Sequence, residues 1–192
     1  MIKRKTAVLG ALLLLSGCIA STDMSSIRNP NWIPKSMDKI LVWVESNDLG
    51  LRRSLEDEFL VKGRDYEVEM IPALDVFFPG DRHSVGEISE IMRSRGITAI
   101  LQVIPGYSGS LRVDMPLNIQ RISEDQTVVT GGRGSARKLT AGFTVNLVDA
   151  ITERTIWTAS ADTGGNIYAG QGTLRSSFVS KTIEKLIVDG IL

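Results

Sequence analysis

The chain has 192 residues, with 22 basic and 22 acidic side chains and a mean hydropathy of +0.06. This length suits one folded domain, and the balanced charge argues against a nucleic-acid-binding protein, which needs a clustered basic face. The only cysteine is Cys18 and the only histidine is His83, so neither an intramolecular disulfide nor a typical zinc set of His and Cys ligands can form. We expect no metal and no cofactor.

The first 17 residues have the pattern of a secretory signal peptide. Three basic residues at positions 3–5 precede the apolar run 7–15, which is too short to remain as a membrane-spanning helix. The sequence Leu15-Ser16-Gly17-Cys18 then resembles a bacterial lipobox. The resemblance implies that a diacylglycerol is attached to the thiol of Cys18, that signal peptidase II cleaves after Gly17, and that the new amino group is acylated.

Acylation at Cys18 predicts a membrane-anchored protein, because several buried acyl chains anchor stably where one is marginal. In families that sort lipoproteins between two membranes, Asp after the cysteine retains them in the inner membrane. Ile19 stands there instead, which favours the periplasmic face of the outer membrane. The alternative is an ordinary secreted protein whose cysteine lies beside the cleavage site by chance. Cleavage removes three basic residues and no acidic one, so 19 basic and 22 acidic residues remain.

Residues 18–37 are predicted to be a lipidated tether. They are polar and show neither helical nor strand periodicity. Pro30 and Pro34 bracket Trp32 and favour extended backbone. We expect Trp32 to dock on the domain, with a place at the lipid interface or in solvent as the alternatives. The folded periplasmic domain is expected to span residues 38–192.

The first part of this domain predicts the order β-α-β-α-β. Apolar runs at 39–45 and 97–104 indicate buried strands, and 66–71 alternates as a strand with one wet face. Between them, Asn47 or Asp48 caps a helix that ends near Gly63. Its apolar face holds Leu51, Leu55 and Phe59, whereas Arg52, Arg53, Glu56 and Asp57 lie mostly off that face.

A second helix is predicted from its capping box. Ser84 and Glu87 have the spacing in which each side chain bonds the other residue's backbone N–H, and Gly96 is a suitable stop. The apolar face between them holds Val85, Ile88, Ile91 and Met92.

The rest of the chain predicts a β-meander and a last helix. Residues 111–119 alternate apolar and polar side chains, and Pro116 confines that strand to an edge or a bulge. A return strand at 127–129 and two strands at 139–148 and 154–161 follow. Thr173 caps the last helix, which buries Val179, Ile183, Leu186 and Ile187. The fold class is therefore α/β, with a mixed sheet of α+β type in a single domain.

Two stretches carry a family resemblance. Lys39-Ile40-Leu41-Val42, followed by Leu51-Arg52-Arg53 and Glu56-Asp57, resembles a group of uncharacterised bacterial envelope lipoproteins, as does the hairpin of Val145–Asp149 with Thr155-Ile156-Trp157. Residues 38–192 are also similar in outline to the periplasmic α/β domain shared by the TolB N-terminal domain, penicillin-binding-protein activator lipoproteins and the curli secretion lipoprotein. The resemblance implies a non-enzymatic envelope role, and it carries over no catalytic residues.

One loop is a candidate docking site for another envelope protein. Phe77-Phe78-Pro79-Gly80 places two adjacent aromatic side chains in a predicted loop, where one is expected in the core and the other in solvent. An exposed aromatic beside Arg82 and His83 has the character of a binding anchor. The alternative is that both rings serve packing alone.

Two further hypotheses concern other segments. Residues 106–138 could form a membrane-inserting hairpin, because the arm 111–119 has the length of an outer-membrane strand. The protein would then be a subunit of an oligomeric secretion or pore complex; the alternative is a strand packed on the domain. The second hypothesis is a hydrolase. Its catalytic residue would be His83, which Asp75 and Asp81 flank, or Ser108, which follows a strand but lacks the G-x-S-x-G spacing. Residues 131–135 lack the G-K-[ST] ending of a phosphate loop and do not open an evident helix, so we interpret them as a flexible hairpin arm.

The sequence therefore predicts an outer-membrane-anchored periplasmic lipoprotein without catalytic residues. Its expected role is that of an accessory or adaptor of an envelope protein assembly. Its expected partners are the membrane, through the lipid on Cys18, and an unidentified envelope protein.

Overall fold

The computed structural model describes residues 20–192 except positions 36, 38, 115–117, 124–125, 131–134 and 167. The side chains of residues 85 and 113–136 are likewise left undescribed. The predicted lipidation site, Cys18, and the predicted cleavage site, Gly17, lie outside the described residues, so both remain predictions. The glycine-rich stretch 131–134 lies outside them too.

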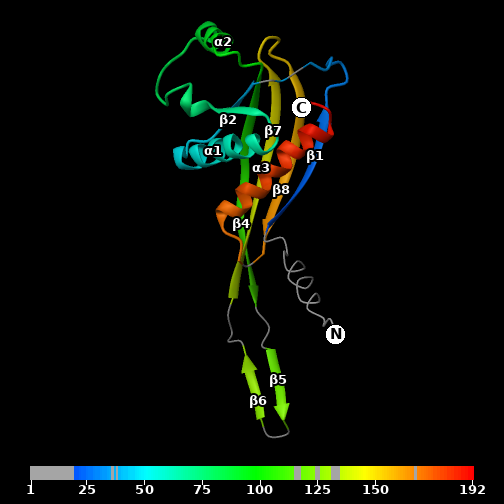
Figure 1. The fold of residues 1–192 in the computed structure, drawn as a ribbon. Coiled ribbons are helices and arrows are strands. Elements are labelled where there is room, and N and C mark those ends of the chain that lie inside the picture. The colour runs from blue at the N-terminus through cyan, green and yellow to red at the C-terminus, as the bar shows by residue number, and fades with distance from the viewer. Residues whose placement is uncertain are drawn as a thin grey trace, which may run out of the picture.

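The domain is a mixed six-stranded sheet with helices on both faces (Figure 1). The strands β2 (Lys39–Val44), β3 (Glu69–Pro72) and β4 (Ala99–Asp114) are parallel, whereas β1 (Ala20–Arg28), β7 (Ser135–Asp149) and β8 (Thr155–Gly165) join the sheet in antiparallel pairs. The order across the sheet is β1-β8-β7-β4-β2-β3. The predicted mixed α/β fold is confirmed.

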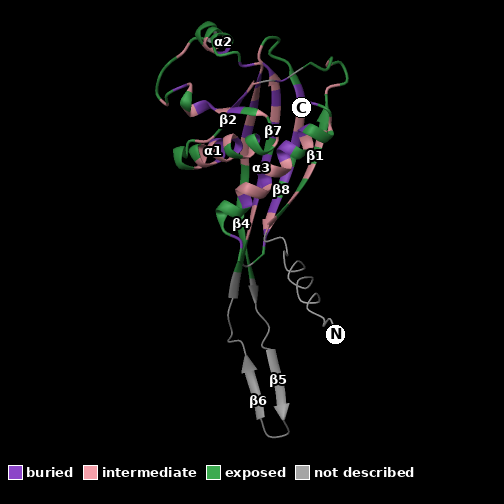
Figure 2. Ribbon diagram, viewed as in Figure 1, coloured by how far each residue is buried: buried purple, intermediate pink, exposed green. Residues whose placement is uncertain are grey.

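Two hydrophobic clusters lie on opposite faces of this sheet. The larger one packs the sheet against α1 (Leu49–Asp65) and α3 (Gln171–Val188) and holds most of the buried residues in Figure 2. There the rings of Phe143 and Phe178 stack with centroids 3.9 Å apart, and Phe59 meets Phe178 edge-on at 6.0 Å. The smaller cluster lies under η1 (Ala73–Asp75) and α2 (Val85–Ser94). Alternate residues of β2 serve the two clusters because successive strand side chains point to opposite faces.

The helix signals that act over a few residues are confirmed. Asp48 caps α1 by accepting hydrogen bonds from the backbone N–H groups of Gly50 and Leu51. Ser84 and Glu87 form the predicted capping box, and Gly96, at φ 69°, adopts the left-handed conformation that follows the end of α2. These features need only neighbours in sequence, so the sequence pattern is sufficient to predict them.

Two predicted helix boundaries are wrong. Gly63 is a buried residue inside α1, and the helix continues to Asp65. A Cβ atom at Gly63 would lie 2.8 Å from the carbonyl oxygen of Val68, so close approach of the returning chain explains the glycine. At the last helix, Gly170 is the N-cap and Thr173 lies within α3. Ile187, predicted to be buried, is 39% exposed because it lies close to the end of that helix.

The tether prediction is wrong for residues 20–28, which form the edge strand β1. Ala20, Thr22, Met24 and Ser26 are half-buried, while the residues between them are exposed. The hydroxyl of Thr22 lies 2.9 Å from the hydroxyls of both Thr163 and Ser177. Two of the four inward side chains of β1, Thr22 and Ser26, are polar and have partners far away in sequence, so a hydrophobicity pattern does not show this face.

The end of α3 holds β1 in place. A carboxylate oxygen of Asp189 accepts hydrogen bonds from the hydroxyl of Ser26 at 2.5 Å and the indole N–H of Trp157 at 2.7 Å, and Lys185 donates to its other oxygen at 3.0 Å. Burial raises the pKa of Asp189, but these hydrogen bonds outweigh it and lower the pKa overall. Trp32, which follows β1, packs against the larger cluster, as the docking prediction expected.

The strands β4 and β7 extend beyond the rest of the sheet. Residues 97–104 and 111–119 were expected to form separate strands, but β4 is continuous from Ala99 to Asp114, with an irregularity between Pro105 and Ser108 where its register with β7 shifts. The short strands β5 (Asn118–Ser123) and β6 (Gln126–Thr130) form a second, two-stranded sheet at the far end (Figure 1). We call residues 110–114 of β4 and 135–139 of β7, together with β5 and β6, the β-arm.

The described helices include no candidate membrane span, because none combines the required length with sufficient hydropathy.

Candidate partner-docking site

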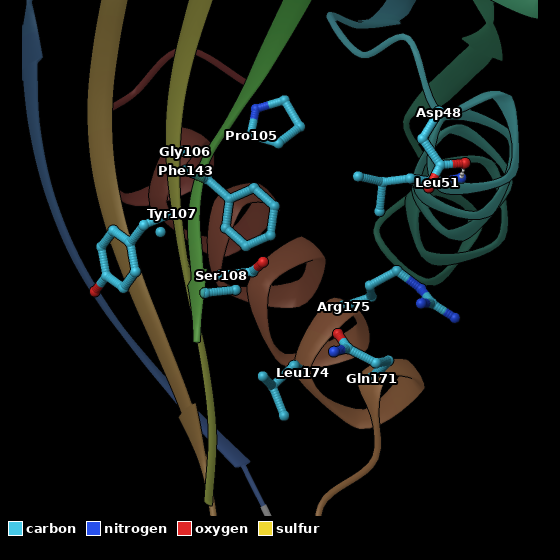
Figure 3. A pocket seen from close by; sticks show the side chains of 12 residues that line it. Asp48, Leu51, Pro105, Gly106, Tyr107, Ser108, Phe143, Gln171, Leu174 and Arg175 are labelled. Atoms are coloured by element: carbon cyan, nitrogen blue, oxygen red, sulfur yellow. Dashed lines mark hydrogen bonds between the residues drawn. The ribbon is translucent and has the colours of Figure 1, made fainter. Parts of the chain in front are cut away.

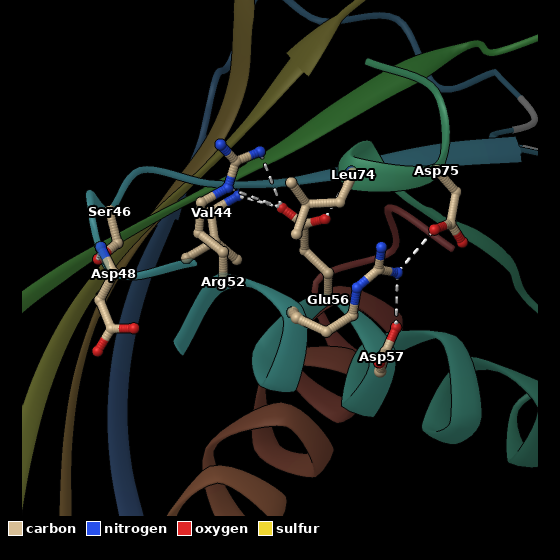
Figure 4. A network of polar contacts seen from close by, with 9 residues as sticks. Val44, Ser46, Asp48, Arg52, Glu56, Asp57, Leu74 and Asp75 are labelled. Atoms are coloured by element: carbon tan, nitrogen blue, oxygen red, sulfur yellow. Dashed lines mark hydrogen bonds and ion pairs between the residues drawn. The ribbon is translucent and has the colours of Figure 1, made fainter. Parts of the chain in front are cut away.

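The loop that carries the predicted docking residues is fixed by a buried carboxylate. Glu56 of α1 is completely buried, although the helix pattern places it mostly off the apolar face; that expectation is wrong. One of its oxygens accepts the backbone N–H of Leu74 at 2.8 Å (Figure 4). The other accepts the backbone N–H of Val44 at 3.3 Å and lies 3.4 Å from the guanidinium of Arg52. Glu56 thus joins the end of β2 to the start of η1.

The electrostatics of this contact are set by burial. Loss of water around the carboxylate raises the pKa of Glu56, while the hydrogen bonds from Leu74 and Val44 and the charge of Arg52 act in the opposite direction. Next to it, Arg53 reaches Asp75 at 2.6 Å and Asp57 at 3.3 Å. Asp75 was considered as a carboxylate partner for His83. In the structure, its carboxylate pairs with Arg53 instead.

The two adjacent phenylalanines divide as the sequence indicates. Phe77 is 5% exposed and packs its ring 5.8 Å from Trp43 and 5.6 Å from His83, measured between centroids. Phe78 is 72% exposed, Arg82 is exposed and His83 is half-buried. The predicted split into one core ring and one exposed ring is confirmed. Phe77 anchors the loop, and Phe78 is left available on its surface.

A groove that the sequence did not predict lies beside this loop. It has a volume of about 300 Å³, with mostly apolar walls. Met92 and Ile88 of α2 form one wall, and Phe77 of the loop forms another. The strands contribute Leu41, Trp43, Ile100 and Val148, with Glu45 and Gln102 as the polar members of the lining. Because its walls come from five separate elements, no local sequence pattern indicates it. We call it the α2 groove.

A row of polar side chains continues from the α2 groove across the sheet. The side-chain amide of Gln102 donates a hydrogen bond to the carboxylate of Glu45 at 2.5 Å. The side-chain amide of Asn146 donates to the side-chain oxygen of Gln102 at 3.0 Å. The hydroxyl of Thr158 donates to the side-chain oxygen of Asn146 at 2.7 Å. The row connects β4, β7 and β8 on the face opposite α1 and α3. The site therefore combines an apolar groove, an exposed aromatic ring and an adjoining polar sheet surface.

A second cavity, of about 270 Å³, lies on the other face of the sheet between the beginnings of α1 and α3 (Figure 3). Phe143 and Leu174 are among its apolar residues, and Ser108 and Arg175 are among its polar ones. Asp48, which also lines it, is occupied by the cap of α1. Ser108 thus faces this cavity, whereas His83 packs on Phe77 at the opposite face. The structure does not bring these two proposed hydrolase residues together.

Within the described residues, no three side chains of the His, Cys, Asp and Glu types gather closely enough to hold a metal ion.

No protein-family model matches the sequence, and a comparison with curated proteins finds no match. Solved structures do match. A dodecameric PelC variant from Paraburkholderia phytofirmans is similar with a TM-score of 0.52 and 15% identity, over 86% of this chain and 97% of that one. Lipoprotein GNA1162 from Neisseria meningitidis gives a TM-score of 0.44 with 15% identity, over 78% of this chain and 98% of that one. A minor lipoprotein from Acinetobacter baumannii gives 0.39 with 10% identity, over 81% and 95%.

The first of these similarities extends over nearly the whole PelC chain, and it shows that the two proteins share a fold. A shared fold does not transfer a function, which depends on the side chains of a particular site.

Proposed function

We propose that this chain is an outer-membrane lipoprotein that acts as a non-enzymatic accessory subunit of an envelope protein assembly. The observation that carries the proposal is the sequence Leu15-Ser16-Gly17-Cys18, with the first strand beginning only two residues later at Ala20. A lipid on Cys18 would then be joined almost directly to the edge of a rigid sheet. The domain would be held at the membrane surface within a narrow range of distances and orientations.

The α2 groove and Phe78 are the proposed contact surface for the partner. A protein-binding site commonly has an exposed aromatic anchor next to an apolar depression with a polar rim, and this combination occurs here. Phe77 and Glu56 support the anchor from beneath, because one packs the loop on Trp43 and the other holds the backbone of Leu74. The loop therefore presents Phe78 from a fixed base.

Site-specific photo-crosslinking in cells tests this assignment. A photoreactive amino acid in place of Phe78 is expected to give a discrete crosslinked species. Ile151 is the matched control, because it is a similarly exposed apolar residue in the turn between β7 and β8. A partner captured equally from both positions, or from neither, would contradict the docking role of the loop.

A homo-oligomer is the second candidate, and the β-arm is the observation that favours it. An isolated two-stranded ribbon is marginally stable in water, yet β4 and β7 remain paired from Ser110–Leu139 to Asp114–Ser135. Packing against neighbouring copies would stabilise such a ribbon. The PelC chain that shares the fold is a dodecamer.

The native mass of the acylated protein in mild detergent, measured beside Cys18→Ala, tests the second candidate. A ring-sized species is expected if copies pack through their β-arms, and shortening the β5–β6 hairpin is expected to dissociate it. A monomer in both forms would reject the oligomer and leave the adaptor role.

A further inference from the structure

We infer that the cavity between the beginnings of α1 and α3, which we call the α1–α3 cavity, binds a small organic acid with an apolar body and one carboxylate (Figure 3). This site lies on the face of the sheet opposite the docking loop, and it depends neither on a lipid at Cys18 nor on a protein partner. Its evidence is the place of the cavity in the fold, its volume and the distribution of apolar and charged side chains in its lining.

The topology of the sheet explains why a cavity forms at this place. From β2 the chain passes through α1 to β3 on one side, and then through α2 to β4 on the other side of β2. Open α/β sheets form ligand crevices beyond the ends of strands where successive connections leave in opposite directions. Val44, the last residue of β2, pairs with Val103 of β4. The lining residues Asp48 and Pro105 follow these two along the chain, so the cavity opens at that point.

One part of the lining is apolar and belongs to the main core. Phe143 of β7 is 8% exposed and Leu174 of α3 is 2% exposed, while Leu51 of α1 is half-buried. The ring of Phe143 stacks on Phe178 with centroids 3.9 Å apart, so this wall is held in place by the core behind it. An apolar group that enters the cavity removes this surface from water, which favours binding.

The volume limits the ligand to a small molecule. A buried apolar cavity of about 150 Å³ holds a benzene molecule. The α1–α3 cavity, of about 270 Å³, therefore has room for one ring or a short aliphatic chain together with a carboxylate. It is too narrow for the helix of a partner protein, whose diameter with side chains is about 10–12 Å.

Arg175 of α3 gives the cavity its preference for an acid. Its side chain is half-buried in the lining, and its guanidinium has no hydrogen bond or ion pair with any residue that the structure describes. A guanidinium presents its N–H donors in a planar fork that matches the two oxygens of a carboxylate. Ser108 and Gln171 add a hydroxyl and an amide to the same lining.

The one acidic residue of the lining is already engaged. A single oxygen of Asp48 accepts the backbone N–H groups of Gly50 at 2.9 Å and Leu51 at 3.1 Å, so its charge is directed to the beginning of α1. Arg175 is the other charged residue of the lining. The carboxylate of the ligand is therefore placed beside Arg175 and its apolar body beside Phe143.

Three probes of one shape and different charge test the inference. Benzoate, benzamide and benzamidine share a ring and a planar head group, but the first is an anion, the second is neutral and the third is a cation. Each is titrated into the full chain carrying Cys18→Ala, because a detergent would compete for an apolar cavity, and binding is followed by amide NMR. Benzoate is expected to shift the amides of Gly106, Gly142 and Gln171, and to bind about ten-fold or more tightly than benzamide.

Substitutions in the lining connect this preference to the site. Arg175→Gln is expected to weaken benzoate binding by about ten-fold to one-hundred-fold and to leave benzamide binding unchanged. Arg154→Gln removes an exposed arginine in the turn before β8 and is expected to change neither. Ser108→Leu fills the cavity from an exposed position and is expected to abolish the binding of both probes. Unchanged amide spectra away from the cavity show that each variant is folded.

Four results would overturn the inference. Absence of benzoate binding at millimolar concentration would reject the site. Shifts confined to the α2 groove, such as that of Met92, would assign the acid to the other cavity. Equal affinities for benzoate and benzamide, or the same benzoate affinity in Arg175→Gln, would remove the role of the arginine. Tighter binding of benzamidine would show that Asp48 sets the charge preference instead.

Discussion

Replacing Glu56 with alanine is expected to destabilise the domain more than replacing any exposed acidic residue of α1. Without the carboxylate, the backbone N–H groups of Val44 and Leu74 lose their side-chain acceptor. A buried donor left without a partner costs about 1–3 kcal/mol. The removed cost of burying the carboxylate offsets part of this, so we expect a net loss of about 3 kcal/mol, or roughly 6–12 °C in melting temperature for a domain of this size.

Chemical unfolding followed by circular dichroism measures this difference, and Asp57→Ala is the matched control. Asp57 lies one position further along the same helix, but its side chain is half exposed and pairs with Arg53 at 3.3 Å. An exposed ion pair of this kind contributes at most about 1 kcal/mol. Equal losses for the two variants would refute the structural role assigned to Glu56. Glu56→Gln keeps one acceptor oxygen and is expected to lose about 1–2 kcal/mol.

The pH dependence of the same variants tests the electrostatics. Because burial raises the pKa of Glu56 in the folded state, the folded protein binds this proton at a higher pH than the unfolded chain. The stability of the wild type relative to Glu56→Gln is therefore expected to rise as the pH falls from above the folded pKa towards the ordinary value of 4.5. A fall over that range would mean that the hydrogen bonds outweigh burial.

Hydrogen exchange connects this carboxylate to the docking loop. In Glu56→Ala, the amides of residues 73–83 are expected to exchange faster than in the wild type, because the backbone of Leu74 is no longer held. Unchanged protection in that loop would show that the packing of Phe77 alone fixes it.

Three further predictions concern other sites. Asp189→Asn is expected to lose about 2 kcal/mol at neutral pH, and because the pKa of Asp189 is lowered, the difference should vanish in urea titrations as the pH falls through its folded pKa. Gly63→Ala is expected to destabilise the domain by about 1–3 kcal/mol in thermal melts, since the added Cβ would lie 2.8 Å from the carbonyl oxygen of Val68. Gly86→Ala is the control, because open space surrounds this position in α2, and it is expected to stabilise the domain by about 0.5–1 kcal/mol. Cys18→Ala is expected to leave the membrane fraction, and membrane association that persists in this variant would contradict the anchor.

Local patterns in the sequence were sufficient to predict the beginnings of two helices and the general order of elements. The capping box of Ser84 and Glu87 and the cap at Asp48 involve groups within three residues of each other. Such contacts form whenever the helix forms, so the sequence alone specifies them. The division of Phe77 and Phe78 into a core ring and an exposed ring was also predicted, and their exposed fractions are 5% and 72%.

The predictions that were wrong concern contacts between segments that are far apart in the sequence. The sequence pattern predicts a tether at β1 because two of its four inward side chains, Thr22 and Ser26, are polar, and their partners Ser177 and Asp189 lie over 150 residues away. The helix pattern places Glu56 mostly off the apolar face because a charged residue usually faces solvent, yet two backbone N–H donors from separate segments, Val44 and Leu74, hold it in the interior. The α2 groove was missed because its walls meet only after folding.

By itself, the sequence determined the local elements of this protein, its mixed α/β class and the hypothesis of an anchor at Cys18, because each depends on residues that are close together in the chain. Only the tertiary structure decided that Ala20 starts an edge strand, that Glu56 is buried and that the α2 groove forms. Those features depend on strand register and on contacts between distant segments. Their free energy comes from pairing and burial that no short stretch of sequence contains.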